Sequence, residues 1–222
     1  KGLKIGAITI RHDVEDVFIG RKKGLTIFDI KDGGTVATGA LRRRSQLKHL
    51  RPDLNIVELR GNVPSRIQKF LDSNWDGVIL ARAGVERLKL NKNISSIIPL
   101  DFMLTAPGQG ALGIEIRDND NRITEIVKVL HNENCALAVR AEREFLKALN
   151  GGCQAPIAAY ATVQPNGLVL DGFVGSLDGS ITFRKRIRGK KSDPEALGTK
   201  LALEILNAGA KDILDEIFKE NR

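Results

Sequence analysis

A cysteine on a glycine turn is the residue of this chain whose setting most favours chemistry. Cys153 follows Gly151 and Gly152, directly after a segment, 134–149, that is expected to be helical. Two glycines end a helix and allow backbone conformations that other residues avoid, so the thiol can project into a cleft. The alternative is a small apolar residue in a core, because a free cysteine is most often buried.

Arginines recur where predicted strands lead into predicted helices. In chain order they are Arg42, Arg43 and Arg44 after Thr38, Arg60 and Arg66 on either side of Asn62, and Arg87 after Ala81. Positive charge at a helix N-terminus is unfavourable, because the helix dipole already places positive charge there. A bound anion removes this conflict, and arginine favours planar carboxylates or phosphates held by two hydrogen bonds. We expect an anion cleft at this edge, with Arg44 exposed to solvent.

Four motifs resemble those of the porphobilinogen deaminase family, also called hydroxymethylbilane synthases, and they occur in the order in which that family carries them. They are Thr38-Gly39-Ala40-Leu41-Arg42-Arg43, Arg60-Gly61-Asn62-Val63-Pro64-Ser65-Arg66, Pro107-Gly108-Gln109-Gly110-Ala111 and Gly151-Gly152-Cys153-Gln154-Ala155-Pro156. The resemblance covers essentially the whole chain.

The resemblance implies a transferase of heme and tetrapyrrole biosynthesis. Such an enzyme joins four porphobilinogen units into the linear tetrapyrrole hydroxymethylbilane with release of ammonia, on a dipyrromethane primer held by a cysteine. It implies that Cys153 bears this cofactor through a thioether and that Thr38, Arg42 and Arg43 hold the cofactor's carboxylates. Arg60, Arg66 and Arg87 would meet the substrate or the growing chain.

Two departures from the family pattern matter. Gly39 and Ala40 stand where the family usually has serines, which removes any hydroxyl contact there. The family's N-terminal Ser-x-Lys-Asp-x-Pro motif, whose aspartate assists the reaction, is not found in this sequence. We therefore expect most of the family's first domain to be missing, no catalytic residue in this chain, and no turnover by the chain alone. Asp13, Asp16 and Asp76 lie in no matching motif, so none is assigned that role.

The elements predict an α/β fold. Strands and helices alternate up to about residue 90, which favours a parallel or mixed sheet that binds ligands beyond the carboxyl ends of its strands. Three strands joined by hairpin turns follow Cys153, and Asp193-Pro194 begins a helix. By resemblance, two lobes with mixed sheets like those of periplasmic binding proteins, the first lobe incomplete, precede a small α+β domain with a three-stranded antiparallel sheet. The expected division is 1–14 with 105–127 as the remnant of domain 1, 15–104 as domain 2, and 128–222 as domain 3.

Composition limits the remaining possibilities. The net charge of +8 favours anionic ligands, but aromatic residues make up only 5%, so nucleic acid is not expected as a partner. The apolar runs are too short to span a membrane and no signal peptide is seen, so a cytoplasmic protein is expected. Two cysteines and three scattered histidines predict neither a disulfide framework nor a metal site. We expect a monomer when the protein is full length.

A two-lobed anion-binding module without catalysis is the main alternative to an enzyme. A thiol presented at Cys153 argues against it, since a simple binder has no use for such a group. A nucleic-acid binder is the second alternative, and it predicts salt-dependent binding to duplex DNA.

Overall fold

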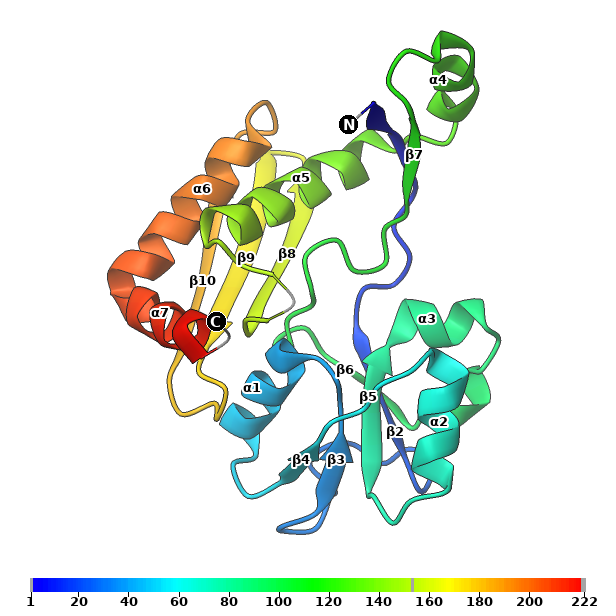
Figure 1. Cartoon of the computed structure of the whole chain (residues 1–222), viewed down its shortest axis with the longest axis vertical. Coiled ribbons are helices and arrows are strands. Elements are labelled where there is room, and N and C mark those ends of the chain that lie inside the picture. Colours follow the sequence, from blue (N-terminus) through cyan, green and yellow to red (C-terminus); the bar gives the residue numbers. More distant parts are fainter. Residues whose placement is uncertain (1, 153, 221–222) are drawn as a thin grey trace.

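The computed structural model describes residues 2–152 and 154–220, which form three sheets (Figure 1). The largest sheet has five strands in the order β4-β3-β5-β2-β6. Their bounds are β2 Asp16–Gly20, β3 Thr35–Ala37, β4 Asn55–Val57, β5 Gly77–Ala81 and β6 Ser96–Ile98. Strands β3, β4 and β5 are parallel, whereas β2 runs antiparallel to both β5 and β6. The carboxyl ends of the three parallel strands and the start of β2 therefore share one edge.

Helices α1 (Leu41–Leu50), α2 (Val63–Leu71) and α3 (Arg82–Arg87) follow β3, β4 and β5. Helix α2 has a regular N-terminus, because the Asn62 side chain accepts a hydrogen bond from the Ser65 amide and Pro64 occupies the first turn. Helix α1 has no side-chain cap and no acidic residue in its first turn. Its backbone N–H groups are thus left facing the shared edge of the sheet.

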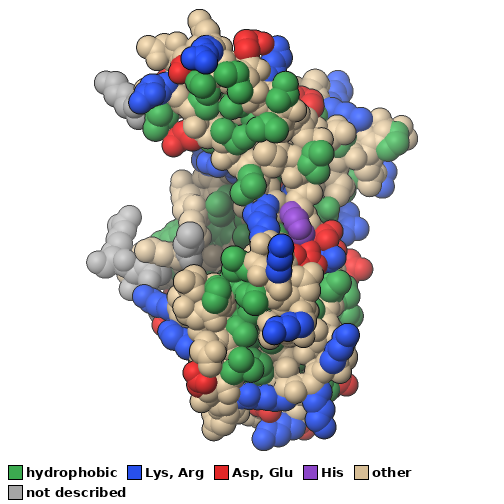
Figure 2. Space-filling view, turned by 90° about the vertical axis from the view of Figure 1, so that its right-hand side faces the viewer, with side chains coloured by type: hydrophobic (Ala, Val, Ile, Leu, Met, Phe, Trp, Pro, Cys, Tyr) green, Lys and Arg blue, Asp and Glu red, His purple; other side chains and the backbone are tan. Residues whose placement is uncertain are grey.

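A two-stranded ribbon, β1 (Leu3–Ile8) paired antiparallel with β7 (Gly113–Arg117), carries helix α4 (Asn121–Lys128). Its core is small, consisting of Ala7, Ile116 and Val127 with a few partly buried neighbours. Large apolar side chains remain exposed on it: Leu3, Ile5, Ile126, Val129 and Leu130. Hydrophobic side chains accordingly gather on the upper part of the face in Figure 2, the end to which β7 and α4 belong.

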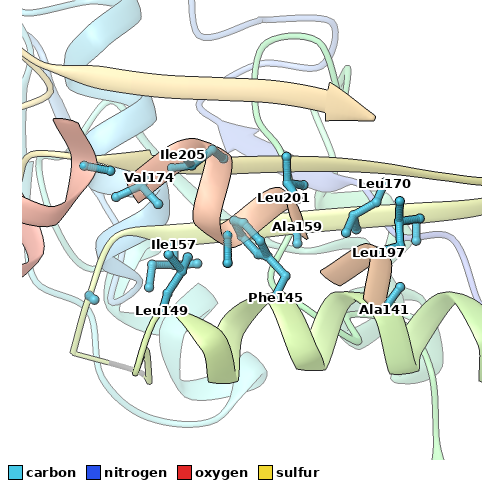
Figure 3. Packing of buried hydrophobic residues seen from close by; sticks show 14 of the residues in the cluster. Ala141, Phe145, Leu149, Ile157, Ala159, Leu170, Val174, Leu197, Leu201 and Ile205 are labelled. Atoms are coloured by element: carbon cyan, nitrogen blue, oxygen red, sulfur yellow. The ribbon is translucent and has the colours of Figure 1, made fainter. Parts of the chain in front are cut away.

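The C-terminal sheet has the order β10-β9-β8, with bounds β8 Ile157–Gln164, β9 Gly167–Gly175 and β10 Thr182–Gly189. Both pairings are antiparallel, as the hairpin turns predict. Helices α5 (Glu133–Ala148) and α6 (Pro194–Ile205) cover one face of it, and α7 (Lys211–Glu220) follows a turn at Gly209. Phe145 and Leu201 are fully buried between these helices and the sheet (Figure 3).

The α/β class and the three-stranded antiparallel domain agree with the sequence prediction. Some local predictions were wrong. The third helix was expected at about 84–89 but spans Arg82–Arg87, and β6 and β7 were not predicted as separate strands. Within residues 2–152 and 154–220, no helix has the length and apolar character needed to cross a membrane.

Candidate functional site

Two buried arginines converge on one carboxylate at the shared edge of the large sheet. Arg42 and Arg43 are each only 5% exposed, and Asp16, the first residue of β2, is fully buried. Arg42 donates from Nη1 to Asp16 Oδ2 at 2.7 Å and from Nη2 to Asp16 Oδ1 at 3.1 Å. Arg43 Nη2 donates to Oδ1 at 2.8 Å. The Asp16 carboxylate thus partly neutralises the positive charge that Arg42 and Arg43 bring to the start of α1.

Asp16 remains ionised in this setting. Burial acts to raise the pKa of its carboxyl group, but the charges of Arg42 and Arg43 and their hydrogen bonds outweigh it and hold the pKa well below its usual range. Two guanidinium groups and one carboxylate leave the cluster with a net positive charge. An anion is therefore favoured beside it.

Gln109 ties this cluster to the segment that returns from the large sheet toward β7. Its Nε2 donates to Asp16 Oδ1 at 3.0 Å and to the Val14 carbonyl at 2.5 Å, and its Oε1 accepts from Arg42 Nη2 at 2.8 Å. Arg42 Nη1 also donates to the Leu104 carbonyl at 3.0 Å. Asp16 at the start of β2, together with Leu104 and Gln109 of the returning segment, thus holds Arg42 in place.

Arg43 and Arg66 carry more positive charge than Asp16 alone neutralises. The Nε of Arg43 is buried without a hydrogen-bond partner among the described residues. Burial and the nearby charge of Arg43 lower the pKa of Arg66, which lies in the first half of α2. Two cations that repel each other beside an unused buried donor indicate a place for an anion.

A cavity of about 250 Å³ opens at the uncapped start of α1. Its lining residues are Thr38, Gly39, Ala40, Leu41, Arg44, Ile56, Val57 and Glu58. Thr38 is buried, and its Oγ1 accepts a weak 3.4 Å hydrogen bond from the Ala40 amide. Adding a Cβ at Gly39 would bring it within 2.4 Å of the Leu59 carbonyl oxygen, so the backbone approach itself requires glycine there.

Arg60 and Arg87 have contacts other than Asp16 among the described residues. Arg60 is 83% exposed in its side chain and pairs with Glu58 at 2.6 Å. Arg87 is exposed and donates to the Gly110 carbonyl at 3.1 Å. The expectation that Arg87 lies early in its helix was wrong, because it is the last residue of α3, where the helix dipole favours positive charge. Arg44 is exposed, as predicted.

The cysteine assignment falls on a position outside the described residues, Cys153. The turn before it is described: Asn150 has a φ of 51°, and a Cβ at Gly151 would lie 2.4 Å from Ile157 Cδ1. The positive φ of this turn therefore lies at Asn150, and neither Gly151 nor Gly152 has a positive φ. Cys135 is buried in α5, as expected, and burial raises the pKa of its thiol.

The ribbon is joined to the large sheet by two crossing segments, residues 9–15 and 99–112. One ion pair holds both of them. Arg11 pairs with the fully buried Glu142 of α5 through bonds of 2.6 and 3.0 Å, and its Nε donates to the Gln109 carbonyl at 2.9 Å. Glu142 also accepts from the backbone amides of Gly108 at 2.6 Å and Ala161 at 2.7 Å. One carboxylate thus links both crossing segments to the C-terminal sheet.

One histidine lies beside two carboxylates near the same crossing. Single ligand atoms of His12, Asp13 and Glu86 lie within 4.8 Å of one another. Arg82, however, pairs with Asp13 at 2.7 Å and with Glu86 at 2.8 Å. The guanidinium group therefore supplies the positive charge that a cation would otherwise bring.

Asp16 and Gln109 were not predicted as site residues. The available signals were an aspartate directly before the apolar run Val17–Ile19 and a glutamine within the Gly108-Gln109-Gly110 motif. Neither signal reveals the partner, because the bonds join residues that are 26 and 93 positions apart.

Two family models and many curated relatives match this chain. Residues 1–125 match the family model "Porphobilinogen deaminase, dipyromethane cofactor binding domain", and residues 136–207 match "Porphobilinogen deaminase, C-terminal domain". The porphobilinogen deaminase of Moorella thermoacetica is 46% identical over 98% of this chain and 69% of its own length. That of Chlorobium phaeovibrioides is 46% identical over 99% of this chain and 71% of its own length.

Solved structures give weaker matches. An ArgBP mutant from T. maritima has a TM-score of 0.34 and 19% identity, covering 56% of this chain and 53% of that chain. A putative methionine-binding lipoprotein from Bacillus subtilis has a TM-score of 0.38 and 13% identity, covering 60% of this chain and 63% of that chain.

An α/β protein with an arginine-rich anion edge and a small antiparallel C-terminal domain is the class that the fold and the site define. The chain belongs to the porphobilinogen deaminase family, that is, to the hydroxymethylbilane synthases. Its function is that of a transferase of tetrapyrrole and heme biosynthesis that uses porphobilinogen and a dipyrromethane cofactor. Binding without catalysis is not favoured.

Proposed function

We propose that the edge formed by Thr38, Arg42 and Arg43 holds the carboxylates of the dipyrromethane, and that Cys153 carries it through a thioether. The observation that supports this most directly is the buried Nε of Arg43, which lacks a partner among the described residues while Arg66 adds a second positive charge nearby. These donors fit a group that bears several carboxylates. When bound, the dipyrromethane supplies the nucleophilic pyrrole carbon from which the chain grows.

We further propose that Arg60, Arg66 and Arg87 bind the acetate and propionate groups of porphobilinogen or of the growing chain. In support, the charge of Arg43 contributes to the lowered pKa of Arg66, so the two guanidinium groups interact. Arg60 is highly exposed and can exchange Glu58 for a substrate carboxylate at little cost, since exposed ion pairs are weak.

The proposed division has three domains: 1–14 with 105–127, then 15–104, then 128–222. The proposed enzyme is cytoplasmic, is monomeric when full length and does not bind nucleic acid. The 222-residue chain alone is proposed to be inactive. In support, Asp16 is fully buried and already accepts hydrogen bonds from two arginines, so it is not free to stabilise a cationic intermediate.

Intact mass spectrometry of the purified chain tests the cofactor assignment. Where the protein has assembled its cofactor, the expected result is an added mass of one dipyrromethane, mapped by peptide analysis to Cys153 and absent in Cys153→Ser. Cys135→Ser is the matched control and should keep the added mass. A modified Cys135 with an unmodified Cys153 would contradict the assignment. Assays of ammonia release from porphobilinogen then test whether the chain alone is inactive.

A further inference from the structure

Arg42 and Arg43 are neighbours in sequence on one helix, yet their guanidinium groups meet. Side chains at successive helical positions point in directions about 100° apart and do not normally face the same partner. Here both reach Asp16, with hydrogen bonds of 2.7 and 3.1 Å from Arg42 and 2.8 Å from Arg43. Something must hold the two side chains in this convergent arrangement.

Arg42 and Arg43 differ in how many of their hydrogen-bond donors are used within the chain. Both Nη atoms of Arg42 make two bonds each, to Asp16, Leu104 and Gln109. Arg43 makes one bond to Asp16 and a weaker one of 3.3 Å to the Ile79 carbonyl, and its buried Nε makes none within the described part of the chain. Arg43 is thus anchored by one bond from each Nη, and its Nε remains available to a ligand.

We propose that Asp16 is a positioning residue of the enzyme. It fixes the guanidinium of Arg43 so that its remaining N–H groups, together with Arg66, are preorganised for a carboxylate, and Gln109 holds Asp16 from the crossing segment. This inference rests on the proposed function, in which Arg43 binds carboxylates of the cofactor and Arg66, whose charge is coupled to that of Arg43, binds those of porphobilinogen.

Charge alone predicts that removing the Asp16 carboxylate strengthens anion binding, which is the opposite of what a positioning role predicts. Two guanidinium groups and one carboxylate carry a net charge of +1, and replacing Asp16 by asparagine raises it to +2. If Asp16 only competed with the ligand, Asp16→Asn would strengthen anion binding. If Asp16 positions Arg43, the same change weakens binding, because the arginine must be ordered by the ligand itself.

The chain offers a matched control in Asp171, which is 5% exposed and bridges two arginines of β10. It accepts from Arg184 at 2.8 Å and from Arg186 at 2.8 Å, in the C-terminal sheet. Asp171→Asn and Asp16→Asn both remove a buried carboxylate that holds two arginines. Only Asp16 contacts the arginines of the anion edge.

The experiment measures porphobilinogen binding to the 222-residue chain by calorimetry and records the ¹⁵N signals of the arginine side chains without ligand. Asp16→Asn is expected to bind at least about tenfold more weakly, the loss of about one charge-assisted hydrogen bond. Asp171→Asn should stay within about twofold of the unaltered chain, because distant sites act independently. Equal or tighter binding by Asp16→Asn would overturn the proposal.

The ligand-free spectra separate this proposal from the proposed function. Arg42 and Arg43 should give separate, slowly exchanging Nη signals in the unaltered chain and in Asp171→Asn, and averaged signals in Asp16→Asn. If porphobilinogen does not bind the unaltered chain, the proposed binding role fails while the spectra still decide whether Asp16 orders the arginines. If Asp16→Asn does not fold, Asp16→Glu replaces it: its carboxylate lies one methylene further along the side chain, so unchanged signals of both arginines would then refute the positioning role.

Discussion

Replacing Arg43 by leucine should abolish cofactor retention while leaving the fold largely intact. Arg43 is 5% exposed and donates to Asp16 at 2.8 Å. A charge-assisted contact to a ligand carboxylate contributes about 1.5–3 kcal/mol, so its loss weakens binding roughly 10- to 150-fold. Asp16 keeps two hydrogen bonds from Arg42 and is not left unpaired. The stability loss should therefore be about 1–2 kcal/mol, less than the roughly 3–5 kcal/mol expected when a buried charge loses its only partner.

The assay compares cofactor occupancy by intact mass with the free energy of unfolding in urea. Arg44→Leu is the control, because Arg44 is the next residue, is exposed, and forms no ion pair within the described residues. It should retain the cofactor and change stability by less than about 0.5 kcal/mol. If Arg44→Leu loses the cofactor and Arg43→Leu keeps it, the ligand contacts the cavity at the start of α1 instead, and the reasoning from the buried pair is refuted.

Three further predictions concern the supports of this edge. Glu142→Gln should destabilise the chain by about 3–5 kcal/mol in urea unfolding, because Arg11 would lose its carboxylate partner in a partly buried setting; a loss below about 1 kcal/mol would show that the pair is dispensable. The pKa of Asp16 is lowered by folding, so its contribution to stability is present above its unfolded pKa of about 3.9 and is lost as pH falls toward the lower folded pKa; the stability difference between the unaltered chain and Asp16→Asn should shrink below about pH 4, and a constant difference would contradict this. Gly179→Ala should cost about 1–3 kcal/mol, because φ is +73° and a Cβ there would lie 2.5 Å from the His49 amide nitrogen; thermal unfolding at the unaltered midpoint would disprove this contact.

Local sequence signals determined most of the elements. Asp193 caps α6 and Pro194 occupies its first turn, as the sequence predicts, because both effects depend only on neighbouring backbone groups. The β8–β9 hairpin closes with Gln164 paired to Gly167, again where the turn residues predict it. The alternation of strands and helices likewise placed Arg42 and Arg43 at the edge where the parallel strands have their carboxyl ends.

The tertiary structure alone decided what those arginines contact. The sequence identified β2 as a strand but not its direction, and only its antiparallel pairing with β5 brings Asp16 to the edge where β3 and β5 end. Strand direction and order depend on pairing between residues far apart, which no local pattern encodes. For the same reason the sequence could not show that Gln109, from the crossing segment, completes the cluster. The sequence by itself therefore placed Arg42 and Arg43 at this edge and showed which family the motifs resemble, whereas the fold supplied the buried carboxylate that holds both arginines in place.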